Sequence, residues 1–138
     1  MTPPTRTGPG FNDTIGRELV FIVIIYSPES HVLLMTCLSV LGVGKIGGEV
    51  AFLATVLGIA DELILYDAYA PTLKAQLLDL KHSGIDIPIS TDTRAVKSSD
   101  ICVFSAGLPR NPTIKTRADL LEINLPAAQE CSRALLGF

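Results

Sequence analysis

Short apolar runs alternate with helical stripes along the chain from residue 35 onward. Three of the runs, "CLSVLGV", "ELILYD" and "DICVFSAG", have the length and composition of strands buried in a sheet. A fourth run, "IDIPIST", is a weaker strand because Pro88 would remove a hydrogen-bond donor from the ladder. The pattern therefore predicts four strands alternating with helices.

The first predicted helix follows the first strand directly and covers residues 45–57. One of its faces gathers four apolar side chains: Ile46, Val50, Leu53 and Leu57. Gly58 then supplies the left-handed residue that commonly ends a helix.

Two further helices are predicted. One lies between Pro71, which a first helical turn tolerates, and Gly84, which stops it. Its apolar stripe consists of Leu73, Leu77 and Leu80. The other covers residues 117–136, where Pro126 is expected to kink or restart the helix.

Strands that alternate with helices of this length favour a parallel sheet with helices on both faces, joined by right-handed crossovers. The predicted fold class is therefore α/β, a Rossmann-type doubly wound parallel sheet over residues 35–138. Residues 1–34 are rich in Pro, Gly and Thr and predict an extension or flexible arm. Their apolar segment, residues 19–26, is too short to span a bilayer, so we expect an added strand.

Composition and charge indicate which classes of partner the chain is unsuited to bind. A chain of 138 residues is long enough for one domain with its own core, and its net charge of -3 leaves no basic surface for nucleic acid. Cys37, Cys102 and Cys131 lie in apolar surroundings without metal-ligand spacing, and their odd number argues against a disulfide framework. We therefore expect no nucleic-acid, membrane or metal partner, and a reducing, cytoplasmic location.

The first strand passes into the first helix through "GVGKIG", which has the spacing G-x-G-x-x-G at Gly42, Gly44 and Gly47. The first glycine would permit a tight turn, the second would let the backbone approach a pyrophosphate, and the third would let the helix pack closely. Lys45 and Ile46 belong to the same predicted cofactor contact. Glycines needed only for a turn, and a solvated lysine at a helix start, are the alternatives.

An acidic residue strengthens the cofactor interpretation. Asp67 ends the second strand, 20 residues after Gly47, where a carboxylate can accept hydrogen bonds from the ribose hydroxyls of a dinucleotide. A carboxylate repels a 2′-phosphate, so NAD is favoured over NADP. The alternative is a surface aspartate that merely ends a strand.

A second informative stretch, "SAGLPRNPTIKTRADLLEIN", follows the fourth strand at the carboxyl edge of the predicted sheet. Its arginines, Arg110 and Arg117, can each pair with a carboxylate or polarise a carbonyl. Two charges on a solvated loop are the alternative interpretation.

Four motifs in this order, "GVGKIGG", "LYD", "SAGLPR" and "TRADLLEIN", resemble the N-terminal, NAD-binding half of the lactate/malate dehydrogenase family, closer to the malate dehydrogenases. The resemblance implies that Arg110 holds the distal carboxylate of a 2-hydroxy or 2-keto dicarboxylate. It implies that Arg117 is catalytic and polarises the reacting carbonyl, and that Asn124 contacts the cofactor. It also implies an oxidoreductase of the tricarboxylic acid cycle and a homo-oligomeric full-length protein.

The chain also departs from the family pattern. The segment between the two arginines is one residue longer than usual, and the family's catalytic histidine and its aspartate lie beyond the position that matches Phe138. Neither His31 nor His82 is placed to replace that histidine. We therefore expect domain 35–138 to be truncated before the catalytic domain, and this chain alone to bind cofactor weakly and turn over essentially nothing. A stand-alone NAD-binding or regulatory module is the alternative.

Overall fold

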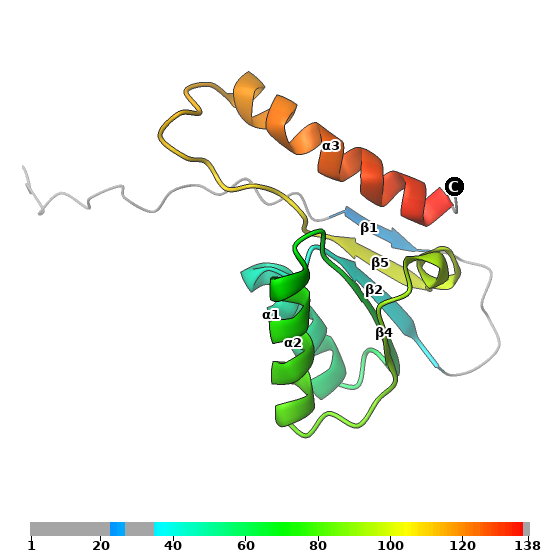
Figure 1. Cartoon of the computed structure of the whole chain (residues 1–138). Coiled ribbons are helices and arrows are strands. Elements are labelled where there is room, and N and C mark those ends of the chain that lie inside the picture. Colours follow the sequence, from blue (N-terminus) through cyan, green and yellow to red (C-terminus); the bar gives the residue numbers. More distant parts are fainter. Residues whose placement is uncertain (1–22, 27–34, 137–138) are drawn as a thin grey trace, which may run out of the picture.

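A computed structural model describes residues 23–26 and 35–136 of the chain (Figure 1). Its strands form one sheet in the order β1-β5-β2-β3-β4. The strands are β1 (Val23–Tyr26), β2 (Cys37–Leu41), β3 (Glu62–Tyr66), β4 (Ile89–Ser90) and β5 (Ile101–Phe104). Strands β2 to β5 are parallel, whereas β1 pairs antiparallel with β5.

The parallel part of the sheet confirms the predicted fold class. In chain order its strands read 3-2-1-4, which is the first part of the doubly wound order. The weak fourth run forms only the two-residue strand β4, in keeping with Pro88 just before it. The apolar segment near the N-terminus does add a strand, and β1 lies along the outer edge of β5.

Helices cover both faces of the sheet (Figure 1). Helices α1 (Lys45–Val56) and α2 (Ala70–His82) lie side by side on one face. Helix α3 (Arg117–Leu136) and the 3₁₀ helix η1 (Thr93–Ser98) cover the other. The hydrophobic pattern did not predict η1, which is capped by the Asp92 carboxylate accepting from the Arg94 amide at 3.0 Å.

The two faces of the sheet bury separate apolar clusters, because successive side chains of a strand point to opposite sides. Strand side chains pack with α1 and α2 on one side: Leu38, Val40, Leu63, Leu65 and Val103 against Ala51, Ala54 and Leu80. On the other side strand residues pack with η1 and α3: Leu41, Ile64 and Cys102 against Val96 and Cys131. The sheet is thus held between two helical layers that fix the strand ends.

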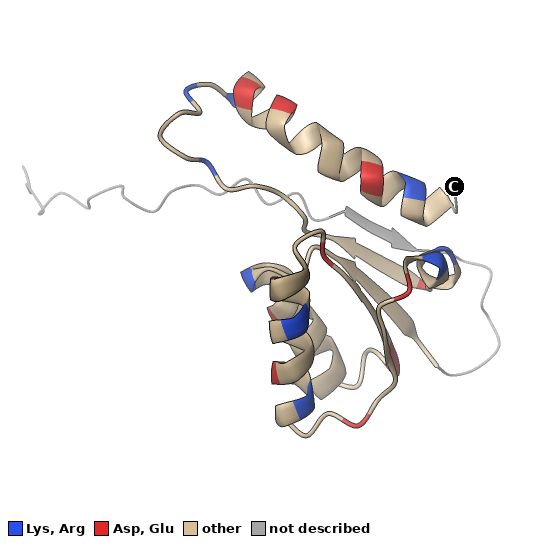
Figure 2. Ribbon diagram, in the orientation of Figure 1, with Lys and Arg blue, Asp and Glu red and all other residues tan. Residues whose placement is uncertain are grey.

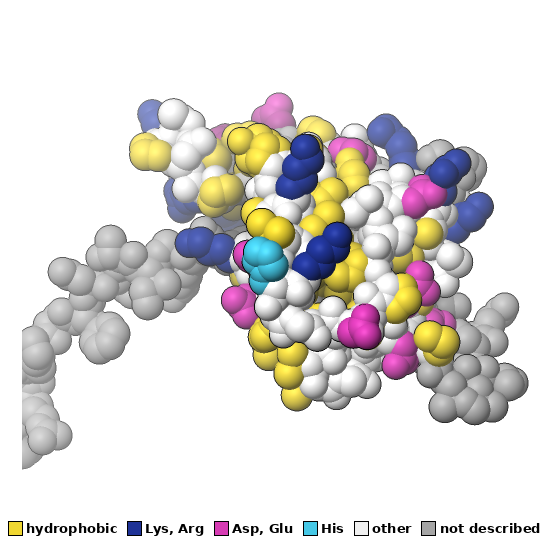
Figure 3. Space-filling model, turned by 60° about the horizontal axis from the view of Figure 1, so that its bottom comes forward, with side chains coloured by type: hydrophobic (Ala, Val, Ile, Leu, Met, Phe, Trp, Pro, Cys, Tyr) yellow, Lys and Arg dark blue, Asp and Glu magenta, His cyan; other side chains and the backbone are white. Residues whose placement is uncertain are grey.

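The predicted apolar stripe of α1 forms only part of the face that packs on the sheet. The residues of α1 that are buried are small: Gly47, Gly48, Ala51 and Ala54. Of the predicted stripe, Val50 packs against the core, whereas Leu53 is 49% and Leu57 67% exposed. The small side chains let the helix axis come close to its neighbours. Apolar side chains are interspersed with charged ones on the face seen in Figure 3.

The predicted boundaries of α3 agree with the structure. Of the two effects predicted for Pro126, the restart is wrong and the kink stays a prediction. The helix runs unbroken from Arg117 to Leu136. One proline removes a single backbone hydrogen bond, and the packing of Cys131 against the sheet holds the helix beyond it. Within the described residues, no helix has the length and apolarity of a membrane span.

Candidate functional site

The glycine loop joins β2 to α1 at the carboxyl edge of the sheet. Gly42 has a φ of 91°, a conformation that favours glycine, and its amide donates to the Tyr66 carbonyl at 2.8 Å. A Cβ atom on Gly42 would overlap the Ala106 backbone, and one on Gly47 would overlap the Gly42 carbonyl oxygen. The tight turn and the close helix packing predicted for these two glycines are therefore present.

The middle of the loop is open. A Cβ on Gly44 would meet no atom within 4 Å, and the first hydrogen bond of α1 runs from the Gly48 amide to the Gly44 carbonyl at 2.8 Å. The amides of Lys45, Ile46 and Gly47 have no acceptor in the part of the chain that the structure describes. Unpaired amides at the positive end of a helix favour an anion. The exposed side chain of Lys45 adds a positive charge there.

The Asp67 carboxylate connects the end of β3 with this loop. Its Oδ2 accepts from the Val43 amide at 2.9 Å, and its Oδ1 accepts from the Tyr69 amide at 2.8 Å. A carboxylate has about four acceptor positions, so each oxygen retains one for a further donor. Asp67 is therefore fixed in place and still able to bind a hydroxyl.

The third motif begins against the glycine loop. The Ser105 hydroxyl donates to the Gly42 carbonyl at 2.6 Å, and the Ser105 amide donates to the Leu41 carbonyl at 2.8 Å. Ser105 is the first residue of the "SAGLPR" motif and was not among the predicted site residues. The structure thus brings the glycine loop, Asp67 and the start of the arginine loop together in one hydrogen-bonded group.

Arg110 lies on the long connection between β5 and α3, and Arg117 begins α3. The connection runs out from the sheet (Figure 2). Arg110 bonds within this connection: its Nε donates to the Ile114 carbonyl at 3.1 Å, and its Nη2 donates to the Lys115 carbonyl at 2.8 Å. Arg117 is exposed at the first residue of α3. Among the described residues, neither arginine has a hydrogen bond or ion pair with the glycine loop.

A capping box begins α3 just before Arg117. The Thr116 hydroxyl accepts from the Asp119 amide at 3.1 Å, and the Asp119 carboxylate accepts from the Thr116 amide at 2.9 Å. These bonds from Thr116 lower the pKa of Asp119. The spacing T-x-x-D was visible in the sequence and could have revealed this fixed end of the loop.

Asn124 lies on α3 and reaches back to the loop. Its side chain bonds with the backbone of Leu108 and with the Leu120 carbonyl. The assignment of Asn124 to the cofactor remains a prediction.

A second tie holds α3 to the sheet. The Tyr66 hydroxyl donates a short hydrogen bond to the Glu130 carboxylate. This bond, with partial burial, raises the pKa of Tyr66 to about 12.

Burial also raises the pKa of the Cys131 thiol to about 12 and of the Cys37 thiol to about 11. Among the described residues, no three His, Cys, Asp or Glu side chains lie together as metal ligands would.

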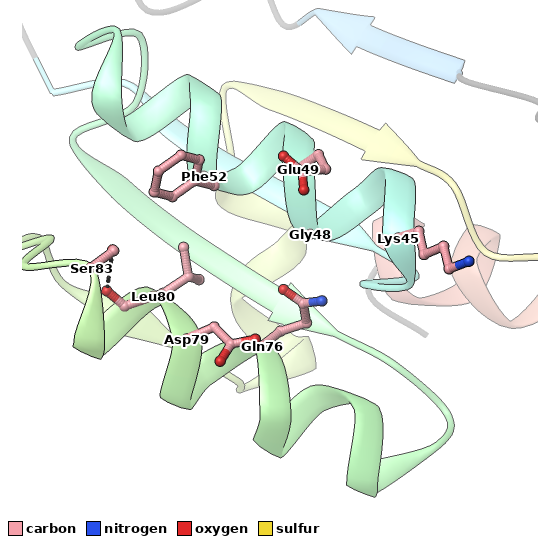
Figure 4. Close-up of a pocket in the computed structure, with 8 residues that line it drawn as sticks. All are labelled: Lys45, Gly48, Glu49, Phe52, Gln76, Asp79, Leu80 and Ser83. Carbon is pink, nitrogen blue, oxygen red and sulfur yellow. Dashed lines mark hydrogen bonds between the residues drawn. The ribbon is translucent and has the colours of Figure 1, made fainter.

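A hollow of about 490 Å³ lies between α1 and α2 (Figure 4). Its lining comprises Lys45, Gly48, Glu49, Phe52, Gln76, Asp79, Leu80 and Ser83. Lys45 is the one predicted site residue in it, and the Glu49 and Asp79 carboxylates would repel a phosphate. The glycine loop and Asp67 are therefore the better candidate site.

Most of the chain is similar to known proteins. Residues 36–136 match the family model described as lactate/malate dehydrogenase, NAD binding domain. Malate dehydrogenase of Pelagibacter ubique is 35% identical over 107 residues, covering 73% of this chain and 33% of that protein. L-lactate dehydrogenase A of Hordeum vulgare is 32% identical over 114 residues, covering 74% of this chain and 32% of that protein.

The solved structures include similar folds. The crystal structure of malate dehydrogenase from Plasmodium falciparum has a TM-score of 0.62 and 30% sequence identity, covering 73% of this chain and 34% of that one. The chain spans about one third of the length of the curated relatives it matches. The match therefore concerns the cofactor-binding part of those proteins.

Proposed function

Since the chain belongs to the lactate/malate dehydrogenase family through its NAD-binding domain, we propose that it is the cofactor-binding half of an NAD-dependent malate dehydrogenase. The observation that carries this proposal is the Asp67 carboxylate bonded to the Val43 amide at 2.9 Å. That bond holds a ribose acceptor beside a loop whose amides are open to a pyrophosphate.

The residues present fit a dinucleotide. The amides of residues 45–47 and the Lys45 side chain would hold the pyrophosphate, and Asp67 would accept from the adenosine ribose. Bound NAD would supply the hydride acceptor of the reaction. The negative charge of Asp67 disfavours a 2′-phosphate, which supports NAD over NADP.

The substrate assignment rests on the two arginines. Arg110 would pair with the distal carboxylate of malate or oxaloacetate, and Arg117 would polarise the carbonyl that reacts. A positive side chain at position 110 offers a partner for a second carboxylate, which supports a dicarboxylate over lactate. A positive charge in the first turn of a helix interacts unfavourably with the helix dipole, so Arg117 does not stabilise α3. Its charge is therefore better explained by binding of an anionic substrate.

This chain alone is proposed to bind cofactor without appreciable turnover. Proton transfer at the substrate hydroxyl needs a general base, which contributes roughly 10²- to 10⁴-fold to the rate. His82 ends α2 and so lies at the amino edge of the sheet, away from the site. His31 lies outside the described residues.

Titration with NADH and with NADPH tests the cofactor proposal. We expect NADH to bind more tightly than NADPH, and Asp67→Ala to weaken NADH binding about tenfold or more, because a hydrogen bond to a charged group is worth about 1.5–3 kcal/mol. Asp86→Ala, which removes an exposed carboxylate from the loop after α2, is the matched control and is expected to leave the affinity unchanged. Equal affinity of the two cofactors, or an unaffected Asp67→Ala variant, argues against the proposal.

One observation favours the second candidate, a stand-alone NAD-binding or regulatory module. Strand β1 occupies the outer edge of β5, where a fifth parallel strand would lie in the complete doubly wound order. Removing residues 1–34 would uncover that edge and favour association between chains. Light scattering of the shortened chain tests this. A shortened chain that stays monomeric and equally stable would count against the module.

A further inference from the structure

We propose that Asn124 is a positioning residue whose carboxamide fastens Leu108 to α3 and so fixes the end of the arginine loop that leaves the sheet. The importance of this contact for substrate binding rests on the function proposed above. The contact itself follows from hydrogen bonds that are independent of any ligand.

The Asn124 carboxamide forms a reciprocal pair of hydrogen bonds with the backbone of one loop residue, Leu108. Its Oδ1 accepts from the Leu108 amide at 2.5 Å, and its Nδ2 donates to the Leu108 carbonyl at 3.3 Å. The second Nδ2 hydrogen is directed to the Leu120 carbonyl, one helical turn back, at 3.0 Å. The side chain thus bonds to the loop and to α3 simultaneously.

Only a carboxamide can make this set of bonds. The three bonds need one acceptor and two donors from the side chain, whereas a carboxylate of the same shape can only accept. The neighbouring Gly107 fits the same geometry, because a Cβ there would come within 3.2 Å of the Asn124 Oδ1. The loop residue beside the contact is therefore one without a side chain.

The connection between β5 and α3 is fastened to α3 at two points. Asn124 holds it at Leu108, and the Thr116–Asp119 capping box holds it at the start of α3. Residues 109–115 lie between these two points and are held together by the bonds from Arg110 to the Ile114 and Lys115 carbonyls. Arg110 is two residues beyond Leu108, so the Asn124 contact helps to set where this bonded segment lies.

These bonds limit the cofactor contact that the family resemblance implies for Asn124. Both of its side-chain hydrogens are engaged by carbonyls, which leaves one Oδ1 lone pair for any other partner. A ligand that took a hydrogen bond from Nδ2 would have to release the loop or the helix carbonyl. Asn124 is therefore suited to hold the loop in the described conformation.

Limited trypsin digestion of the whole chain tests the proposal. Asn124→Asp keeps the shape of the side chain but removes both donors, so cleavage after Arg110 is expected to become about tenfold faster as the local opening becomes easier. Gln129→Glu, which adds the same charge at an exposed position of α3, is the matched control. Cleavage after Lys74 in α2 reports on global unfolding and is expected to stay unchanged in both variants.

Two results would overturn the proposal: equal cleavage after Arg110 in the parent chain and Asn124→Asp, or cleavage that rises equally after Arg110 and Lys74. If Asn124→Asp fails to fold, hydrogen exchange of the Leu108 amide in the parent chain decides. We expect that amide to exchange at least about tenfold more slowly than in an unfolded chain, although its side chain is 62% exposed. Exchange at the unfolded rate would contradict the contact. Neither readout uses cofactor, so a negative NADH titration would refute the proposed function and leave this inference standing.

Discussion

The Asp67 carboxylate accepts a hydrogen bond from the Val43 amide at 2.9 Å, so the residue predicted to bind ribose also fixes the glycine loop. The Val43 side chain is fully buried in the cluster beneath α1. The contact therefore joins the apolar core, the loop and the end of β3. Changes at the loop are expected to separate into those that disturb this packing and those that disturb only ligand binding.

Gly44→Ala and Gly47→Ala are a matched pair that distinguishes an effect on ligand binding from an effect on packing. A methyl group on Gly47 would overlap the Gly42 carbonyl oxygen and come within 2.6 Å of the Ser105 hydroxyl, whereas one on Gly44 would meet nothing within 4 Å. We expect Gly47→Ala to lower the free energy of unfolding by about 1–3 kcal/mol. Gly44→Ala is expected to keep its stability and lose NADH affinity. Urea unfolding and NADH titration of both variants measure this, and similar unfolding midpoints would refute it.

Arg110→Gln tests the proposed dicarboxylate specificity. Loss of a charge-assisted pair is expected to weaken oxaloacetate binding to the NADH-loaded chain about tenfold or more. Calorimetry measures the affinity. Arg133→Gln, which removes an exposed arginine from the far end of α3, is the control. If both variants bind oxaloacetate as the parent does, Arg110 is not the carboxylate partner.

The bond between Tyr66 and Glu130 predicts a pH dependence of stability. The pKa of Tyr66 is raised from 10.0 to about 12 in the folded chain, so the neutral hydroxyl favours folding. This contribution is fully present below pH 10 and is lost as the pH rises through about 12. The difference in unfolding free energy between the parent chain and Tyr66→Phe should therefore shrink across that interval. A difference that stays constant up to pH 12 would exclude this linkage.

The strands and helices could be predicted from the sequence because their signals are local. Residues 37–41, 62–66 and 101–104 lie in short apolar runs, and α3 occupies the predicted residues 117–136. The buried face of α1 could not be predicted in this way. Periodicity identifies an apolar stripe such as Leu53 and Leu57, but it does not show that the helix packs through Gly47, Gly48, Ala51 and Ala54.

The candidate site was also predictable only where its signals are local in the sequence. The G-x-G-x-x-G spacing and Asp67 indicated where the cofactor residues lie, because their roles depend on positions along a strand and the following helix. The partners of Asn124 and Tyr66 could not be predicted. Leu108 is 16 residues from Asn124 and Glu130 is 64 residues from Tyr66 in the chain, so only the folded arrangement brings each pair together.

The most direct test of the account is a nuclear magnetic resonance titration of the ¹⁵N-labelled chain with NADH. We expect NADH to shift the amide resonances of Lys45, Ile46 and Gly47 most strongly, because these groups lack acceptors in the described part of the chain. The amide resonances of residues around Lys97 on η1 are expected not to shift. Absence of binding, or binding that shifts resonances elsewhere and leaves residues 45–47 unchanged, would contradict the proposed cofactor site.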